Sequence, residues 1–232
     1  MKAIVTGSNS GIGLHCFNEL HKRGFNVHGI DINYNNQEHE NKYQCDLSDP
    51  DKARNVFDKI GDYDYAINCA CISGVRKRFK DIQYEEYLTG FSDIISPFLN
   101  SIINEVRIYN LNTNKKKIIN IASSTAMVGG VNMSIYSSAK AAMINLTKVI
   151  AMENSPTLIV NSISPATIDT PMIRRKYNNT MPNYSNAYPV GSCGNVNDVF
   201  SVIDMMIKND FMTGQNIVLD GGYSSLFELK LK

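Results

Sequence analysis

The stretch VTGSNSGIGLH (residues 5–15) decides the fold, because it joins a short apolar run to an amphipathic segment through closely spaced glycines. Gly7, Gly11 and Gly13 allow a tight backbone turn that larger residues would hinder. They also leave room for a pyrophosphate at the amino terminus of the following helix, where free N–H groups and the helix dipole favour an anion. A glycine-rich turn is not specific by itself. Its position between a first strand and a first helix predicts a dinucleotide-binding unit.

An aspartate ends the second apolar run, NVHGID (26–31). Asp31 lies 18 residues after Gly13, where an acidic side chain accepts hydrogen bonds from the ribose of a bound adenosine. An ordinary turn residue at the end of a strand would also account for it. Together with the glycine turn, Asp31 favours the dinucleotide-binding interpretation.

Short apolar runs alternate with longer amphipathic segments along the rest of the chain. We expect strands at residues 2–5, 26–31, 42–46, 63–70, 116–123, 158–164 and 215–220. We expect helices at residues 12–24, 49–60, 82–108, 134–153 and 195–208. Such alternation is typical of a parallel sheet with helices on both faces. We therefore predict one α/β domain over residues 1–232, a Rossmann-type doubly wound parallel sheet of about seven strands.

The composition is that of an ordinary globular protein and argues against several classes of function. The chain has 232 residues, of which 43% are hydrophobic and 19% charged, and its net charge of +1 gives no reason to expect a nucleic-acid partner. The basic run VRKRFK (75–80) is interpreted as a solvated loop. The five cysteines, odd in number and without paired zinc-ligand spacing, predict reduced thiols and no metal site. Without a leader pattern or a long apolar span, we expect a cytoplasmic protein with no membrane partner.

A tyrosine and a lysine stand four residues apart in YSSAK (136–140). At this spacing Tyr136 and Lys140 project from the same face of a helix. A free phenol titrates near ~10, and an ammonium ~4 Å away is worth roughly 4 kcal/mol to a phenolate in a cleft. We therefore expect Lys140 to lower the pKa of Tyr136 toward neutrality, where proton transfer is most efficient. A helix whose exposed lysine happens to follow a tyrosine would show the same spacing.

These motifs occur in the order found in one enzyme family. The family's YxxxK pair is present as Tyr136 and Lys140, and Ser123 precedes the tyrosine by the 13 residues that separate the family's catalytic serine. The segments NSISPATIDTPM (161–172) and MTGQNIVLDGGYS (212–224) are similar to its nicotinamide-covering segment and its last strand and loop. The family's TGxxxGIG turn corresponds to Thr6, Gly7, Gly11, Ile12 and Gly13. From residue 3 to about residue 224, the sequence resembles a short-chain dehydrogenase/reductase.

The resemblance implies a catalytic role for four residues. Tyr136 would exchange a proton with the substrate oxygen, and Lys140 would lower its pKa and hold the nicotinamide ribose. Ser123 would hydrogen-bond the substrate oxygen, although the neighbouring Ser124 is a rival for this role. The family's helix asparagine, part of a proton relay, appears here as Asp93 in FSDIISPF (91–98). Its negative charge would partly cancel the pull of Lys140 on Tyr136.

The resemblance also implies a set of contacts to the cofactor. Asp46 would meet the adenine edge, Asn68 would fix the cofactor beside the fourth strand, and Ile168 and Thr170 would meet the carboxamide. NAD is expected rather than NADP, because Asp31 would repel a 2′-phosphate. The positions where NADP-preferring relatives carry a basic residue hold Ser10 and Ile32 instead. The expected cofactor-binding residues are Gly7, Ser10, Gly11, Ile12, Gly13, Asp31, Ile32, Asp46, Leu47, Asn68, Tyr136, Lys140, Ile168 and Thr170.

Two further departures from the family pattern lie close to the expected cofactor. The family's NNAG reads NCAC, which puts Cys71 in place of a glycine, and the PG after the sixth strand reads PA, with Ala166. Both replacements are small, and we expect them to shift the loops rather than to block binding.

The sequence thus predicts an NAD(H)-dependent oxidoreductase that interconverts an alcohol and a carbonyl on a small or medium-sized substrate. The alternative is a non-catalytic NAD-binding regulatory or scaffold protein on the same fold. A short polar lid is expected at about residues 171–190, where Arg174, Arg175 and Lys176 either attract an anionic substrate or form a solvated loop. The resemblance implies a homotetramer or homodimer, and the alternating tail SLFELKLK (225–232) offers a surface for a partner copy to cover.

Overall fold

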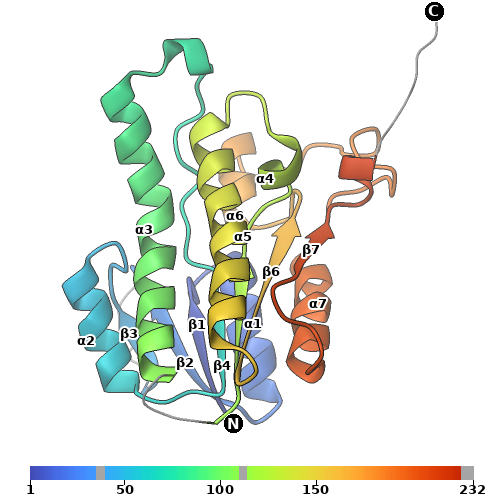
Figure 1. Cartoon of the computed structure of the whole chain (residues 1–232). Helices are drawn as coiled ribbons and strands as arrows, with labels where there is room; N and C mark the ends of the chain where they lie inside the picture. Colours follow the sequence, from blue (N-terminus) through green and yellow to red (C-terminus); the bar gives the residue numbers. More distant parts are fainter. Residues whose placement is uncertain (35–39, 110–113, 226–232) are drawn as a thin grey trace, which may run out of the picture.

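The computed structural model describes residues 1–34, 40–109 and 114–225, which form one seven-stranded sheet (Figure 1). The strand order is β3-β2-β1-β4-β5-β6-β7, and every pairing is parallel. This confirms the predicted doubly wound α/β fold. The strands are β1 (Lys2–Thr6), β2 (Asn26–Asp31), β3 (Lys42–Gln44), β4 (Tyr65–Asn68), β5 (Lys116–Ile121), β6 (Leu158–Pro165) and β7 (Asn216–Leu219).

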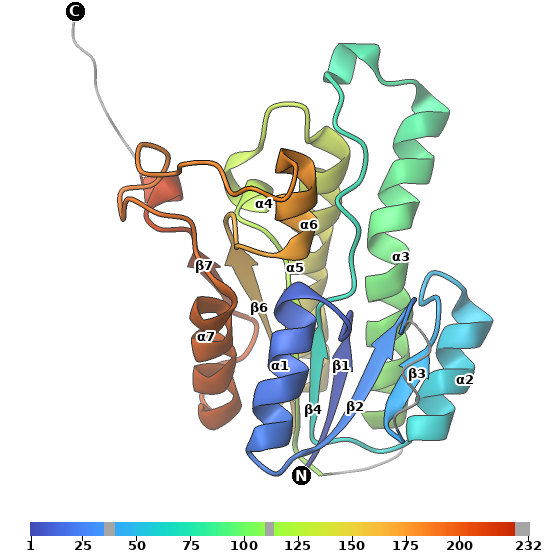
Figure 2. The same ribbon diagram turned by 180° about the vertical axis from the view of Figure 1, so that it is seen from behind.

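Helices cover both faces of this sheet. α1 (Gly11–Lys22) and α7 (Val196–Lys208) pack on one face, shown in front in Figure 2. α2 (Pro50–Ile60), α3 (Tyr84–Tyr109) and α5 (Ser134–Asn154) pack on the other, seen in Figure 1. Neighbouring residues of a strand point to opposite faces, so Ile4 joins the α2–α3–α5 core while Val5 joins the α1–α7 core. Inner strands such as β5 and β6 are therefore buried on both faces, rather than alternating between a buried and an exposed face.

Five short elements escaped the periodicity analysis, because each is too short to show an amphipathic repeat. Two are one-turn helices beyond the carboxyl ends of the strands, α4 (Thr125–Val128) and α6 (Pro171–Arg174). The others are 3₁₀ turns: η1 (Phe79–Asp81), η2 (Arg175–Tyr177) and η3 (Tyr223–Ser225). Most of the expected carboxyl-terminal tail lies outside the described residues. None of the helices in the described ranges is long and apolar enough to cross a membrane.

The order of the strands reverses beside β1. The chain passes from β1 outward to β2 and β3, and then returns to the other side of β1 as β4. At such a switch point the loops that follow adjacent strands diverge and leave a crevice at the carboxyl edge of the sheet. The loop after β1 leads into α1, and the loop after β4 leads toward α3, so both border this crevice.

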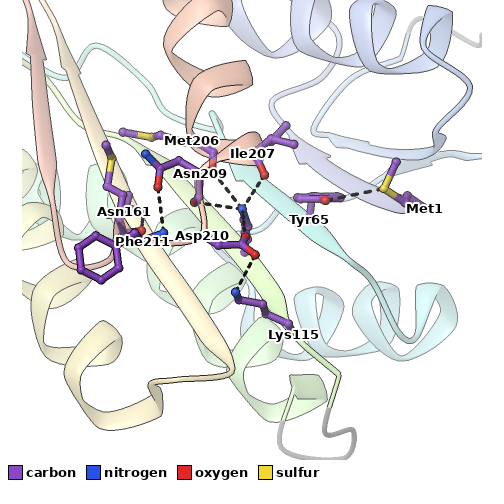
Figure 3. A network of polar contacts seen from close by, with 11 residues as sticks. Met1, Tyr65, Lys115, Asn161, Met206, Ile207, Asn209, Asp210 and Phe211 are labelled. Atoms are coloured by element: carbon purple, nitrogen blue, oxygen red, sulfur yellow. Dashed lines mark hydrogen bonds and ion pairs between the residues drawn. The ribbon is translucent and has the colours of Figure 1, made fainter.

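The opposite, amino-terminal edge of the sheet carries two buried lysines at the start of β5. Lys116 is 0% exposed, donates to the carbonyl of Tyr63 at 2.6 Å and pairs with Asp62. Lys117 points to the other face, where its Nζ donates to the carbonyl groups of Met206, Ile207 and Asn209 at the end of α7. Figure 3 labels these three residues. Both cations therefore bind groups that the ends of neighbouring segments leave free.

Candidate active site

A cavity of about 410 Å³ occupies the crevice at the switch point. Its wall combines the glycine turn, the ends of β2 and β5, the loops after β3 and β4, part of α3 and the start of the predicted lid. The lining residues are Gly7, Ser10, Gly11, Ile12, Gly13, Asp31, Ile32, Cys45, Asp46, Leu47, Ser48, Cys69, Ala70, Cys71, Ile72, Asp93, Pro97, Ile121, Thr170, Met172 and Arg175.

The glycine turn is packed so closely that two of its positions exclude a side chain. A Cβ atom on Gly13 would lie 2.1 Å from the carbonyl oxygen of Gly7. Gly7 has φ +67, and a Cβ atom there would lie 2.8 Å from the backbone nitrogen of Ala70. Ser10, the residue that precedes α1, makes no side-chain hydrogen bond to the helix. The first backbone N–H groups of α1 are therefore available to an anion. The turn thus fits a dinucleotide pyrophosphate.

Asp31 ties the end of β2 to the glycine turn. Its Oδ2 accepts a hydrogen bond from the backbone N–H of Asn9 at 2.9 Å, and its Oδ1 accepts one from Asn33 at 3.1 Å. The carboxylate also lines the cavity beside Ile32, whose side chain is 64% exposed. These two bonds fix the carboxylate at the cavity wall.

The Tyr136–Lys140 pair lies on α5, next to the end of β5. Lys140 is 2% exposed, and its Nζ donates to the carbonyl of Ile121 at 2.9 Å. The same nitrogen lies 5.7 Å from the centre of the Tyr136 ring. Ser123 follows β5, is buried, and lies 3.0 Å from the Thr125 hydroxyl through its Oγ. Ile121 lines the cavity, so it connects the lysine to the cavity wall.

The family of the chain follows from a match over nearly its whole length. The model of the enoyl-(acyl carrier protein) reductase family matches residues 7–224. The chain belongs to the short-chain dehydrogenase/reductase family.

Relatives of this short-chain dehydrogenase/reductase act on different substrates, to judge by their names. A 3-oxoacyl-(acyl-carrier-protein) reductase of Buchnera aphidicola is 28% identical, over 95% of this chain and 96% of that protein. 4-Hydroxyisoleucine dehydrogenase in complex with NADH is 28% identical, with a TM-score of 0.86 over 97% of this chain and 99% of that one. ElxO with NADP bound, at 24% identity and a TM-score of 0.87 over 97% and 99% of the two chains, shares the fold. The comparisons support a nicotinamide dinucleotide as the cofactor class.

Burial controls the acid–base properties of Tyr136 and Lys140. Burial raises the pKa of Tyr136, and the Lys140 ammonium and Ser123 hydroxyl pull it down without reversing the direction. The expected lowering by Lys140 is therefore present, but in the cofactor-free protein it does not determine the net shift. For Lys140, burial lowers the pKa, whereas Cys71 and Tyr136 raise it, and the net direction is upward. Lys140 is accordingly a stable cation.

The structure distinguishes between the two candidate serines. The Ser123 hydroxyl lies close enough to Tyr136 to stabilise its phenolate, and it also accepts from the backbone N–H of Thr125 at 3.3 Å. Ser124 is 3% exposed, and its backbone N–H donates to the carbonyl of Pro165 at 2.9 Å. Ser123 is thus the serine that faces the tyrosine.

Two other predicted site residues are not part of the main cavity wall. Asn68 is 3% exposed, and its side chain points into the core rather than into the cavity. Ile168 lines a neighbouring cavity of about 360 Å³. Asp93 and Asp46 both line the main cavity. Asp93 is exposed and comes from α3, whereas Asp46 comes from the loop after β3, and its Oδ1 accepts from the backbone N–H of Ser48 at 2.9 Å.

Sequence reasoning missed several groups around the site. Cys71 was noted only as a departure from a glycine, yet its thiol lies beside Lys140 and raises the pKa of both Lys140 and Tyr136. Arg76 was assigned to a solvated loop, yet its charge acts on Tyr136. Both residues lie in the loop after β4. Local sequence patterns do not show that this loop comes close to α5. The sequence does not single out Glu105, because one acidic residue in an amphipathic helix is common and is usually exposed.

Proposed function

We propose that this short-chain dehydrogenase/reductase interconverts an alcohol and a carbonyl with NAD(H), using Tyr136 as general acid and base. The observation that carries the proposal is the convergence of Tyr136, Lys140 and Ser123 next to Ile121, a residue of the cavity wall. A bound nicotinamide would supply or accept the hydride. A non-catalytic binding protein would have no physical need for a buried cation beside a buried phenol, since both are costly to desolvate.

Each of the three side chains has a distinct task. Ser123 donates a hydrogen bond to the substrate oxygen and stabilises the charge that develops there. Tyr136 gives a proton to that oxygen during carbonyl reduction and removes it during alcohol oxidation. Lys140 stays protonated and stabilises the phenolate form of Tyr136, and we propose that it also donates to the nicotinamide ribose of the bound cofactor.

NAD(H) is proposed over NADP(H) because of the groups around the adenosine end of the cavity. The carboxylate of Asp31 would repel a 2′-phosphate, and Ser10 and Ile32 beside it provide no positive charge to compensate. The NADH complex of 4-hydroxyisoleucine dehydrogenase supports this choice, whereas the NADP complex of ElxO shows that the fold accepts either cofactor.

The substrate is proposed to carry a negative charge. Arg76, after β4, favours the ionised form of Tyr136, and burial together with Arg76 lowers the pKa of Lys176 in η2. No salt bridge joins Arg76 or Lys176 to a carboxylate of the described residues, whereas Arg174 forms two hydrogen bonds of 2.6 Å with Asp169. Arg76 acts on both Tyr136 and Lys176, so a carboxylate or phosphate of the substrate that approached these cations would be stabilised.

The proposed oligomer is a homotetramer or homodimer. α3 and α5 pack together and expose Ile103, Val149 and Met152, which are 60%, 42% and 78% exposed. Large apolar side chains on adjacent helices favour pairing with a second copy. Light scattering at micromolar concentration should show a dimer or a tetramer, and a monomer would refute this part of the proposal.

A cofactor titration followed by a substrate screen tests the function. NADH should bind more tightly than NADPH, and Asp31→Ala should reduce the difference by removing the repulsive charge. The screen compares alcohols and ketones with and without a carboxylate or phosphate, monitored at the nicotinamide absorbance. Equal or tighter binding of NADPH would refute the cofactor choice. Tight NADH binding without turnover of any substrate would favour the non-catalytic alternative.

A further inference from the structure

A carboxylic acid lies in the core beside the strand that leads into the cofactor cavity. Glu105 of α3 is 0% exposed. Its Oε2 accepts a hydrogen bond from Nδ2 of Asn68 at 2.9 Å, while its Oε1 is without a hydrogen-bond partner among the described residues. Burial, only partly offset by the bond from Asn68, raises the pKa of Glu105 to about 8. The carboxyl group is therefore mostly protonated at neutral pH.

Asn68 connects this carboxyl group to the rest of a buried polar network. Besides donating to Glu105, its Nδ2 donates to Oδ1 of Asn120 at 3.0 Å, so both amide hydrogens are used. Its Oδ1 accepts from the hydroxyl of Thr6 at 3.4 Å. Asn120 is itself oriented, because its Nδ2 donates to the hydroxyl of Thr147 at 2.9 Å. Every hydrogen bond of the Asn68 side chain thus has a defined direction.

Thr6 passes this orientation on to the cavity wall. Its Oγ1 accepts hydrogen bonds from the backbone N–H groups of Cys69 and Ala70, both at 3.2 Å. Cys69 and Ala70 line the cavity, and Ala70 is the residue against which Gly7 packs. The hydroxyl can accept both bonds only while its single proton is donated elsewhere, and Asn68 Oδ1 is the acceptor of that proton.

A flipped Asn68 amide would break this arrangement. Its oxygen would then face Oδ1 of Asn120, and its NH₂ group would face Thr6, which would have to give up an acceptor position. With its proton on Oε1, Glu105 opposes the flip, because Oε2 is then an acceptor that would face the amide oxygen instead of a donor. An unpaired buried donor or acceptor costs about 1–3 kcal/mol, so an acceptor at this place is sufficient to select one orientation.

We propose that Glu105 is a positioning residue for the cofactor site: it holds the Asn68 amide in the orientation that lets Thr6 order the Cys69–Ala70 loop. Glu105 acts without touching the cofactor, through two side chains and the backbone. The inference rests on the proposed function only in that a nicotinamide dinucleotide occupies the main cavity.

The same placement makes the site sensitive to alkaline pH. The groups around Glu105 are neutral. Asn68 of β4 donates to its side chain, and Asn120 of β5 is one hydrogen bond further away. The hydroxyl of Tyr63 donates to the backbone carbonyl of Glu105 at 3.0 Å. Burial, followed by the charge of Glu105, raises the pKa of Tyr63, so this phenol stays neutral. Within the described ranges, no salt bridge links Glu105 to a cation. Ionised Glu105 would therefore be driven out of the core toward water, and Asn68 would lose its acceptor.

Two substitutions separate positioning from bulk. Glu105→Gln keeps the shape and an acceptor oxygen for Asn68 but cannot ionise, whereas Glu105→Met fills the space without an acceptor. At pH 7, E105M should raise the Kd of NADH about tenfold, the equivalent of one lost buried hydrogen bond, and E105Q should change it by less than about twofold. From pH 7 to pH 9 the Kd of the wild type should rise several-fold, and that of E105Q should rise less. Ile102→Val, a buried change one turn away on α3, is the control for general loosening.

Thermal unfolding of the cofactor-free protein gives an independent result. A folded-state pKa of about 8 lies above the value of about 4.3 for an unfolded glutamate, so folded Glu105 binds the extra proton between these values. The stability of the wild type relative to E105Q should therefore fall as pH rises from 5 to 8 and then level off. A parallel pH dependence of Tm in the two proteins would refute the buried neutral carboxyl.

An E105M that binds NADH like the wild type, or an E105Q that loses NADH affinity at high pH to the same extent, would refute the positioning role. If E105M does not fold, E105Q alone decides. A wild type that binds neither NADH nor NADPH would instead refute the assigned cofactor class.

Discussion

Replacing Lys117 with methionine tests how much a buried lysine stabilises the end of a helix. Lys117 is 6% exposed, and its Nζ lies 2.5 Å from the carbonyl oxygen of Ile207, 3.1 Å from that of Asn209 and 3.4 Å from that of Met206 (Figure 3). These carbonyl groups end α7, where the helix dipole also favours a cation. Methionine has similar length and no charge, so Lys117→Met removes these hydrogen bonds without leaving a large cavity.

The expected loss of stability follows from the number and kind of these bonds. A hydrogen bond to a charged group contributes about 1.5–3 kcal/mol, and Lys117 makes two short ones to carbonyl groups. The variant no longer has to bury an ammonium, and this gain offsets part of the stability lost with the two hydrogen bonds. The net loss of unfolding free energy is about 3 kcal/mol. For a chain of this length, each kcal/mol shifts Tm by about 2–4 °C, so Tm should fall by about 6–12 °C.

Lys115→Met is the matched control. Lys115 and Lys117 both form an ion pair with Asp210, at 2.8 Å and 2.7 Å. The side chain of Lys115 is 43% exposed, however, whereas that of Lys117 is 7% exposed. Exposed ion pairs contribute little, so Tm should fall by no more than about 2 °C. Both variants should be measured by calorimetry and should keep the wild-type circular dichroism spectrum. Equal shifts in the two variants would show that the shared ion pair with Asp210, rather than the buried helix cap, is what matters.

Three further predictions concern the catalytic pair. Tyr136→Phe should reduce turnover by about 10²–10⁴-fold and leave the Kd of NADH unchanged, because only the transferable proton is lost; near-normal turnover would contradict the mechanism. Cys71 raises the pKa of Tyr136, so Cys71→Ala should lower it and shift the acidic limb of alcohol oxidation, which needs the phenolate, to lower pH. Cys69→Ala is its control in the same loop, and an equal shift in both variants would count against a specific effect of Cys71. Asp93 is exposed, so Asp93→Asn should leave the pH profile of turnover unchanged; a shift of the basic limb to lower pH would instead assign the carboxylate to the proton relay.

The arrangement of the sheet could be predicted from the sequence because the strands are buried on both faces. Apolar runs such as KKIINIAS (116–123) stand out against the amphipathic helices, and the glycine turn marks where the first crossover begins. The predicted strand 63–70 proved to be β4, Tyr65–Asn68, since the segment beyond Asn68 leaves the ladder to line the cavity. α4 and α6 could not be predicted, because a single turn carries no periodicity.

The candidate site could be predicted as far as local spacing determines it. An i,i+4 pair on a helix must lie on one face, and Tyr136 and Lys140 do. The function of Asn68 could not be read in the same way. A position in a motif gives proximity to the cofactor but not the direction of the side chain, and this side chain turns away from the cavity toward Glu105 and Asn120.

The same limit explains why the net pKa shift of Tyr136 differs from the expectation. The spacing supplies one contribution, the charge of Lys140, which acts over a single helical turn. The opposing contributions are tertiary: burial by surrounding elements, and the Cys71 thiol brought in by the loop after β4. Burial also strengthens the Coulomb interaction, because it removes the water that would screen the ammonium. A buried pair therefore has a large attraction and a large desolvation cost of opposite sign, and the difference between them depends on what else enters the site. In the proposed mechanism substrate and cofactor enter during turnover, so we expect Tyr136 to acquire its working pKa in the complex rather than in the free chain.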